Sequence, residues 1–372
     1  MKKIPLFNLA LENNPLKIKI MKSWSEIYDN NSFTSGKETI KFEKDFSNLC
    51  NTRYALGVHS GTDSLIITLK AAGIKSGDEV ITTPCTFTAT TDAIIHSGAK
   101  PIFADVDQKT GNILPDEIEN KITSKTKAIL LVHLYGVPCE MDKIKKIAKN
   151  HKIFIIEDSS HAHGSLYKGK PVGSFGLAGC FSLYPSKPLG SMGNAGVITS
   201  NNKAFIDKAR SYANHGILIH KNKYEHFRVG FNKLIDNLQS AVLIHKIPTL
   251  KQKIVKKISI AKKYNEAFSK IDEPGMYWPN NTEPSLYVYS IQTKKIKEYR
   301  EHFSKHSIEA NSYYPIPLHL QPSLKFLGYK KGDFPNAEKF FSQTLSIPLF
   351  PQLTESEVNH IVKTISLLKK NN

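Results

Sequence analysis

The chain carries a lysine, Lys187, in surroundings that suit amine chemistry. The apolar run Ile153–Ile156 ends in two carboxylates, Glu157 and Asp158, and a second apolar segment, Gly179–Tyr184, leads to Lys187. A buried strand with an acid at its carboxyl end places a negative charge where α/β sheets bind ligands. An aspartate there can hold the pyridinium nitrogen of pyridoxal 5′-phosphate (PLP) protonated, while a lysine one strand away forms a Schiff base with it. The pair therefore predicts carbon-acid chemistry at a PLP site, with Lys187 and Asp158 as the catalytic residues.

The segment Ser60–Asp63 lies between a predicted strand and a predicted helix. Backbone N–H groups at such a helix start point toward the ligand crevice and bind phosphate. Serine, threonine and aspartate are also common helix caps, and the segment alone favours that simpler interpretation. Together with Lys187 and Asp158 it becomes a predicted phosphate site.

Phe87 occupies a similar place, after one predicted strand and before the next helix. An aromatic ring at this edge of the sheet can stack on a planar cofactor. Ordinary core packing is the more common outcome for a phenylalanine, so both interpretations stay open from the residue alone.

Two histidines, His161 and His163, follow the carboxylates closely. No nearby residues complete the three or four ligands that a zinc ion requires, so we expect no metal site. His161, three residues after Asp158, is better placed to hydrogen-bond a ring substituent of the cofactor.

The segment Gly164–Lys170 matches the first seven positions of an ATPase phosphate-binding loop, but Pro171 stands where Ser or Thr would coordinate magnesium. It also does not open a helix directly after a strand. We therefore expect a hairpin here and exclude an ATPase.

The elements that must position these residues alternate along the first half of the chain. Several of the apolar runs show no polar alternation, which indicates strands covered on both faces, and alternation with helices predicts a mostly parallel sheet. The predicted strands are Tyr54–Val58, Glu79–Thr83, Pro101–Val106, Ala128–Leu134, Ile153–Glu157, Gly179–Leu183 and Gly196–Ser200. The predicted helices are Thr62–Ala72, Ala89–Ser97, Pro115–Lys121, Met141–Asn150 and Lys203–Ala213.

The pattern changes after Asn232, where one long helix is predicted over Asp236–Phe268. A smaller α+β unit follows, with strands at Leu286–Gln292 and Ile308–Tyr313 around a helix at Lys297–His306. We predict a large PLP-binding domain with an N-terminal segment over residues 1–245, and a small C-terminal domain over residues 246–372.

Composition narrows the function classes further. The 372 residues include 51 Lys and Arg against 33 Asp and Glu, a formal charge of +18. The lysines are scattered, and basic charge alone gives only non-specific affinity for nucleic acid, so nucleic-acid binding is not the favoured interpretation. A basic surface equally suits an anionic, nucleotide-linked substrate.

Nothing in the sequence indicates secretion or a membrane span. The first residues lack a signal-peptide core, and no apolar run approaches the roughly 20 residues that a spanning helix needs. A cytoplasmic enzyme is expected. The widely spaced cysteines then predict buried free thiols, at Cys50, Cys85, Cys139 and Cys180.

Taken together, these motifs resemble the DegT/DnrJ/EryC1/StrS family of sugar aminotransferases, which have the PLP fold type I (aspartate aminotransferase-like) architecture. The resemblance covers almost the whole chain, in family order. It is carried by Ser60–Leu65, Gly77–Thr82, Thr86–Thr90, His133–Gly136, Glu157–Gly164, Tyr184–Gly190, Asn214–Gly216 and Tyr314–Gln321.

The resemblance implies a role for each cofactor residue. Lys187 would form the Schiff base and Asp158 would pair with the pyridine nitrogen. The backbone amides and hydroxyl that hold the phosphate would come from Gly61, Thr62 and Ser182. Phe87 would stack on the ring, and His161 takes a place near the ring hydroxyl that Gln often holds.

Further residues are implied at the edge of the site. Asn232, in the segment Val229–Asn232, matches an asparagine that reaches the phosphate of the neighbouring subunit, which implies a homodimer with shared active sites. Tyr313, Tyr314 and His319 are the candidate substrate-binding residues.

The implied reaction moves an amino group from L-glutamate to a keto group of a nucleotide-linked sugar, for a cell-surface glycan such as the lipopolysaccharide O-antigen or for a secondary metabolite. Two alternatives stay open. Some family members dehydrate a keto-deoxysugar, but these replace the Schiff-base lysine with histidine. A regulatory or nucleic-acid-binding protein on the same scaffold is motivated by the charge of +18.

Three departures from the family pattern bear on the substrate: Leu234 in place of Arg, Asn194 after the lysine, and Tyr313 in place of His. The nucleotide, and whether C3 or C4 is aminated, depend on loops whose sequence does not identify the sugar. These are the first thirty residues, Ile217–Phe227 and Tyr313–Gln321.

Overall fold

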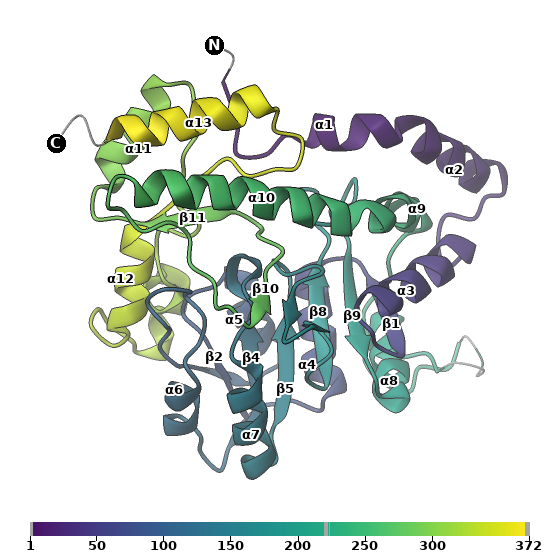
Figure 1. Ribbon diagram of the computed structural model, residues 1–372. Coiled ribbons are helices and arrows are strands. Elements are labelled where there is room, and N and C mark those ends of the chain that lie inside the picture. The colour runs from purple at the N-terminus through teal and green to yellow at the C-terminus, as the bar shows by residue number, and fades with distance from the viewer. Residues whose placement is uncertain (1–2, 219–221, 223, 369–372) are drawn as a thin grey trace.

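A computed structural model describes residues 3–218, 222 and 224–368 (Figure 1). Its centre is a seven-stranded sheet in the order β1-β9-β8-β5-β4-β2-β3. β9 pairs antiparallel with both β1 and β8, and the other pairs are parallel, which confirms the mostly parallel sheet. The strands are β1 Tyr54–Val58, β2 Glu79–Thr82, β3 Lys100–Phe103, β4 Thr126–Val132, β5 Phe154–Asp158, β8 Ala178–Ser182 and β9 Gly196–Ser200.

Helices cover both faces of this sheet, as the continuous apolar strands predict. Side chains of β4 alternate between two clusters: Ile129 and Leu131 pack on one face, and Ala128 and Leu130 on the other. The first cluster includes α6 Pro115–Asn120 and α7 Met141–His151, and the second includes α4 Gly61–Ala71 and α5 Thr88–His96. α8 Lys203–Ala213 packs beside β1.

The predicted hairpin over Gly164–Lys170 is confirmed. Strands β6 Leu166–Tyr167 and β7 Lys170–Pro171 pair antiparallel around Lys168 and Gly169, both with positive φ, as a tight hairpin turn requires. β10 Thr282–Glu283 adds to its other edge, so the hairpin joins two distant parts of the chain.

The prediction of one continuous helix over Asp236–Phe268 is wrong in one respect. The helical segment is divided into α9 Asn237–Lys246 and α10 Leu250–Ser269 by the 3-10 turn η3 Ile247–Thr249, which contains Pro248. Proline lacks the N–H that continues a helix, and its ring clashes with the preceding turn. α10 crosses one end of the sheet (Figure 1).

The C-terminal part differs from the predicted α+β unit in its second strand. Ile308–Tyr313 is not a strand: Ile308 pairs only with Ile4, and Asn311 with Ser346, as isolated bridges. β11 Tyr289–Gln292 pairs instead with β12 Thr344–Ile347. The helices are α11 Ile296–Lys305, α12 Pro335–Gln343 and α13 Glu355–Leu367, with 3-10 turns η4 Leu318–Leu320 and η5 Pro322–Leu327.

The N-terminal segment contains helices that the sequence patterns did not predict. They are α1 Leu9–Asn13, the turn η1 Asn14–Leu16, α2 Lys17–Asp29 and α3 Lys37–Leu49. Both α2 and α3 pack against α9, and Trp24 donates a hydrogen bond to the Leu238 carbonyl. The segment is therefore anchored on α9, near whose end the predicted domain boundary at residue 245 falls; that boundary stays a prediction.

Two composition-based expectations can be checked directly. All four cysteines are buried and free, as expected for thiols that pack in the core. No helix among the described residues combines the length and apolar character needed to cross a membrane.

Candidate active site

A cavity of about 370 Å³ opens where the parallel strands end. This volume is within the range of ordinary small-molecule sites. The loops after β1, β2, β5 and β8 line it, together with segments from the C-terminal part of the chain. The residues of the predicted site that share this cavity are Gly61, Thr62, Phe87, Asp158, His161, Ser182, Lys187, Tyr313 and Tyr314.

Asp158 ends β5 and faces this cavity. The Thr90 hydroxyl donates to its Oδ2 at 2.8 Å, and the Ser160 N–H donates to its Oδ1 at 3.1 Å. Thr90 is in turn hydrogen-bonded to the Thr86 hydroxyl at 2.9 Å. These bonds fix the orientation of the carboxylate while leaving it an acceptor for a proton-bearing nitrogen.

The neighbouring Glu157 has a structural role. Its carboxylate is fully buried and accepts N–H groups of Gly173 at 2.7 Å, Phe175 at 2.7 Å and Gly176 at 2.9 Å. His133 Nε2 lies 3.2 Å from the same carboxylate. Because successive strand residues face opposite sides, only one of the two acids reaches the cavity.

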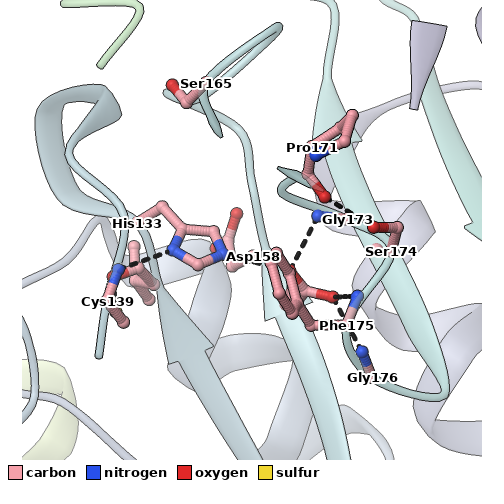
Figure 2. Close-up of polar contacts among 12 residues, drawn as sticks. His133, Cys139, Asp158, Ser165, Pro171, Gly173, Ser174, Phe175 and Gly176 are labelled. Atoms are coloured by element: carbon pink, nitrogen blue, oxygen red, sulfur yellow. Dashed lines mark hydrogen bonds and ion pairs between the residues drawn. The ribbon is translucent and has the colours of Figure 1, made fainter. Parts of the chain in front are cut away.

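The tautomer of His133 follows from its second contact. The Cys139 N–H donates to His133 Nδ1 at 3.1 Å (Figure 2). The ring proton therefore lies on Nε2 and is donated to the Glu157 carboxylate. This network holds the chain on both sides of β5 and thereby the strand end that carries Asp158.

Lys187 lies in the loop after β8, three residues before a close turn. An added Cβ at Gly190 would lie 2.2 Å from the Pro185 carbonyl oxygen, so only glycine allows this loop to close. Lys187 Nζ is 4.5 Å from the centre of the Tyr287 ring. Loss of hydration lowers the pKa of Lys187 from 10.5 to about 8, against a smaller opposing attraction to Asp158.

Helix α4 begins at the edge of the cavity. Ser60 caps it by accepting the Asp63 N–H at 3.0 Å, while the preceding N–H groups of a helix have no intrahelical partner. An added Cβ at Gly61 would lie 2.5 Å from Ser182 Cβ, so glycine lets the helix start approach that serine. The N–H groups of Gly61 and Thr62 and the Ser182 hydroxyl thus line a cradle that fits a phosphate group.

His161 is buried in a stack of rings. It lies 4.4 Å from Tyr287, centre to centre, with the planes 21° apart. Burial lowers its pKa well below 6.5, and the nearby Lys187 and His163 lower it further. Since the Tyr135 N–H donates to His161 Nδ1 at 3.4 Å, the neutral imidazole carries its proton on Nε2. It can donate this proton to an oxygen substituent on the ring of a ligand.

The mouth of the cavity is aromatic. Phe87 is 54% exposed although it precedes a buried helix, and its ring lies 5.5 Å from that of Tyr314. Tyr135 donates its hydroxyl proton to the Tyr313 carbonyl, and this bond holds Tyr313 and the adjacent Tyr314 beside the cavity. A planar ligand would therefore find an exposed ring on one side of the cavity.

Two residues of the predicted site do not line this cavity. Asn232 is exposed, in a bridge with Asn214, as a residue that serves a neighbouring subunit would be. His319 is buried against Phe334 and contacts Glu338 at 3.0 Å, away from the residues that line the cavity.

The three departures from the family pattern lie at different depths. Asn194 lines the cavity, as Tyr313 does, while Leu234 forms a bridge with Val58 next to the α4 start. In the loop Ile217–Phe227, residues 219–221 and 223 lie outside the described residues.

Sequence patterns missed several residues of the cavity. Tyr287 lies a hundred residues after Lys187 and precedes a short strand, so no local spacing connects the two. Thr90 and Ser160 could have been found, because each lies close in sequence to a residue that was identified. Within the described part of the chain, no three His, Cys, Asp or Glu side chains gather as a metal site requires.

The chain was compared with known proteins. A sequence profile of the DegT/DnrJ/EryC1/StrS aminotransferase family matches residues 16–366. The "Pleiotropic regulatory protein" of Geobacillus stearothermophilus is 37% identical over 98% of each chain. The dTDP-3-amino-3,6-dideoxy-alpha-D-galactopyranose transaminase of Aneurinibacillus thermoaerophilus is 36% identical over 98% of this chain and 99% of its own.

Solved structures show the same architecture. DesV of S. venezuelae, in complex with a ketimine intermediate, superimposes with a TM-score of 0.95 at 29% identity, over 100% of this chain and 99% of its own. NtdA of Bacillus subtilis, with bound cofactor PMP, gives 0.92 at 29% identity, over 100% of this chain and 86% of its own.

Proposed function

This chain belongs to the DegT/DnrJ/EryC1/StrS aminotransferase family and is a PLP-dependent sugar aminotransferase, and from that premise we propose that it transfers the amino group of L-glutamate to a keto group of a nucleotide-linked sugar. The observation that carries the proposal is the shared cavity of Lys187, Asp158 and the α4 helix start. In this one cavity the amine matches the aldehyde of the cofactor, the acid matches its pyridine nitrogen, and the cradle matches its phosphate.

Each residue of the cavity has a separate role toward the cofactor, set by its position. When bound, PLP supplies an electron sink that stabilises negative charge on the carbon that loses a proton. Gly61, Thr62 and Ser182 would bind its phosphate, and Asp158 would keep a proton on the pyridine nitrogen. His161 Nε2 would donate to the ring oxygen, because its Nδ1 already accepts a hydrogen bond.

Lys187 performs the proton transfers. Its Nζ would hold the cofactor, and the amine, once an amino donor has taken its place, would accept the α-proton of the donor and give a proton back. A pKa of about 8 suits both directions, because the group exchanges protons readily near neutral pH. The second half of the reaction uses the same residue in reverse order with the keto-sugar as acceptor, which gives ping-pong kinetics.

Retention of Lys187 favours transamination over dehydration, since dehydratases of the family carry histidine at that position. One relative is named as a regulatory protein, so a regulatory role is the second candidate. A DNA mobility shift at near-physiological ionic strength would support it, and no shift would remove it. Because Lys187, Asp158 and the α4 helix start share one cavity, the enzyme is the favoured candidate.

The biological setting is also proposed. We infer a homodimer in which the partner's Asn232 reaches the phosphate, because this side chain is exposed and does not line the cavity of its own subunit. A cytoplasmic enzyme that makes an amino sugar for a cell-surface glycan, such as an O-antigen, is consistent with an anionic nucleotide-linked substrate and a net charge of +18.

The visible absorption spectrum of the purified protein with PLP tests the proposal. A band from bound cofactor should appear, shift to the amine form when L-glutamate is added, and be lost in Lys187→Ala. Conversion of dTDP-, UDP- and GDP-linked keto-sugars, followed by mass spectrometry, then identifies the acceptor. A protein that forms no band, or a Lys187→Ala variant that retains transamination, would contradict the assignment.

A further inference from the structure

Two buried lysines outside the cavity donate hydrogen bonds to backbone carbonyls near Lys187. Lys246 ends α9 and its Nζ donates to the Gly190 carbonyl at 2.7 Å. Lys257, on α10, donates to the Leu286 carbonyl at 2.7 Å. Both side chains lie in the protein interior, so these are charge-assisted bonds in a poorly hydrated environment.

Each of the two carbonyl groups belongs to a segment next to the proposed Schiff-base lysine. Gly190 ends the tight loop Tyr184–Gly190 that contains Lys187. Leu286 precedes Tyr287, whose ring is 4.5 Å from Lys187 Nζ and whose hydroxyl lies 3.4 Å from Ser186 Oγ. A shift of either carbonyl would therefore move a residue that contacts Lys187 or its neighbour.

A carboxylate from the other end of the sequence compensates this buried positive charge. Glu12 lies in α1, and its Oε1 is 3.0 Å from Lys253 Nζ and 3.6 Å from Lys246 Nζ. Loss of hydration lowers the pKa of Lys257 to about 7 and also lowers that of Lys246, while Glu12 raises both. Without this carboxylate the two amines would lose protons more easily and become weaker donors to their carbonyls.

We propose that Glu12 is a positioning residue for Lys187: its carboxylate joins Lys246 of α9 to Lys253 of α10. Lys246, and Lys257 one helical turn after Lys253, then hold the Gly190 and Leu286 carbonyls in the segments next to the catalytic lysine. The proposal rests on the proposed function of Lys187. It assigns to an N-terminal helix, which does not line the cavity, an indirect effect on cofactor binding.

The test substitutes Glu12→Gln in the full-length protein, which removes the charge and keeps the side-chain size. The matched control is Glu301→Gln, an exposed glutamate on α11. Two readouts are followed: the dissociation constant for PLP, by absorbance titration, and hydrogen–deuterium exchange of the cofactor-free protein over residues 184–191 and 285–288. The second readout does not depend on activity.

We expect Glu12→Gln to weaken PLP binding by about tenfold, which corresponds to about 1.4 kcal/mol. Exchange should accelerate in both segments, while Glu301→Gln should change neither readout by more than about twofold, since exposed charges contribute little. Glu12→Asp, which retains the charge with a shorter reach, should recover part of the affinity. An unchanged dissociation constant and unchanged exchange in Glu12→Gln would overturn the proposal.

A second variant covers the case in which Glu12→Gln does not fold. Lys257→Met removes the donor to the Leu286 carbonyl and leaves Glu12 beside Lys253; it should weaken PLP binding and accelerate exchange over residues 285–288, and no change in either would overturn the proposal. Failure of the proposed function looks different. In that case the wild-type protein forms no visible band with PLP, or Lys187→Ala keeps one, whatever Glu12 does.

Discussion

At the scale of single residues, the surroundings of Lys187 favour the neutral form of its amine. Loss of hydration lowers its pKa from 10.5 to about 8 in the cofactor-free protein. The neutral amine is the form that attacks an aldehyde, and at pH 7 the shift makes this form a few hundred times more abundant than for an ordinary lysine.

The rate of PLP capture by the cofactor-free enzyme should therefore depend on pH in a defined way. We expect it to rise about tenfold per unit below pH 8 and to level off above that value, because the amine is then largely neutral. Stopped-flow absorbance at a series of pH values measures this directly. A rate that keeps rising to pH 10 would mean that Lys187 is not desolvated.

Glu157 and Asp158 show how adjacent carboxylates acquire different tasks. Glu157→Ala should destabilise the protein by about 3–5 kcal/mol, because it leaves buried N–H groups of Gly173, Phe175 and Gly176 without an acceptor. Denaturant unfolding midpoints measure the change. Glu140→Ala, at an exposed position paired with Lys143, should change stability by less than about 1 kcal/mol. Equal losses in the two variants would contradict the structural role of Glu157.

The residues that local sequence could identify share one property. Asp158, Lys187 and Gly61 each lie where an apolar strand ends, so the strand pattern itself marks their position. Tyr287 reaches the site, and Lys257 reaches the Leu286 carbonyl beside it, only through the packing of α10 and the C-terminal part, which no local spacing encodes. Sequence could therefore predict the acid, the amine and the phosphate cradle, but not the groups that hold them in place.

At the scale of elements, the approach of α4 to β8 decides whether the phosphate cradle forms. Gly61→Ala places a Cβ within 2.5 Å of Ser182 Cβ and 2.9 Å of Ser182 Cα, so the helix start must move away. We expect PLP affinity to fall by at least about tenfold while the far-ultraviolet circular dichroism spectrum stays unchanged.

A matched control for that prediction lies in the loop after Lys187. Gly193→Ala would meet only the flexible amide of Gln239, at 3.0 Å, and should change PLP affinity by no more than about twofold. If both variants bind PLP like the wild type, the α4 start does not hold the phosphate.

Element boundaries were predictable where one physical signal dominated. The two strands Tyr54–Val58 and Gly196–Ser200 and the helix Lys203–Ala213 were predicted to the residue, because each is apolar or amphipathic between polar ends. The helix over Asp236–Phe268 was predicted without the interruption at Pro248, since its apolar periodicity continues through the proline. The strand at Ile308–Tyr313 failed because its apolar residues pack as a loop rather than pairing along an edge.

At the scale of the whole molecule, the proposed shared active site makes a prediction that a single subunit cannot fulfil. Lys187→Ala and Asn232→Ala are each expected to be inactive or strongly impaired as homodimers. Mixed dimers, formed by refolding the two variants together, should regain activity, because one of their two sites then contains both wild-type residues. Subunit mixing followed by transaminase assay measures this.

The mixing experiment has its own control. Lys187→Ala mixed with Glu157→Ala should not show the same pattern of recovery if Glu157 acts only within the fold of its own subunit. No recovery in the first mixture would place Asn232 and Lys187 in the same subunit's site, and the proposed dimer would then lose its structural basis.

The N-terminal segment also has a consequence for the order in which the protein forms. Ile4 bridges Ile308, the Leu6 N–H donates to the Glu309 carboxylate, and Phe7 stacks on Tyr287. Residues 4–7 thus find their partners some three hundred residues further along the chain, and contacts this distant in sequence are slow to form. The sheet can therefore form before these contacts do, and the contact of Phe7 with Tyr287, the ring beside Lys187, is expected to form late in folding.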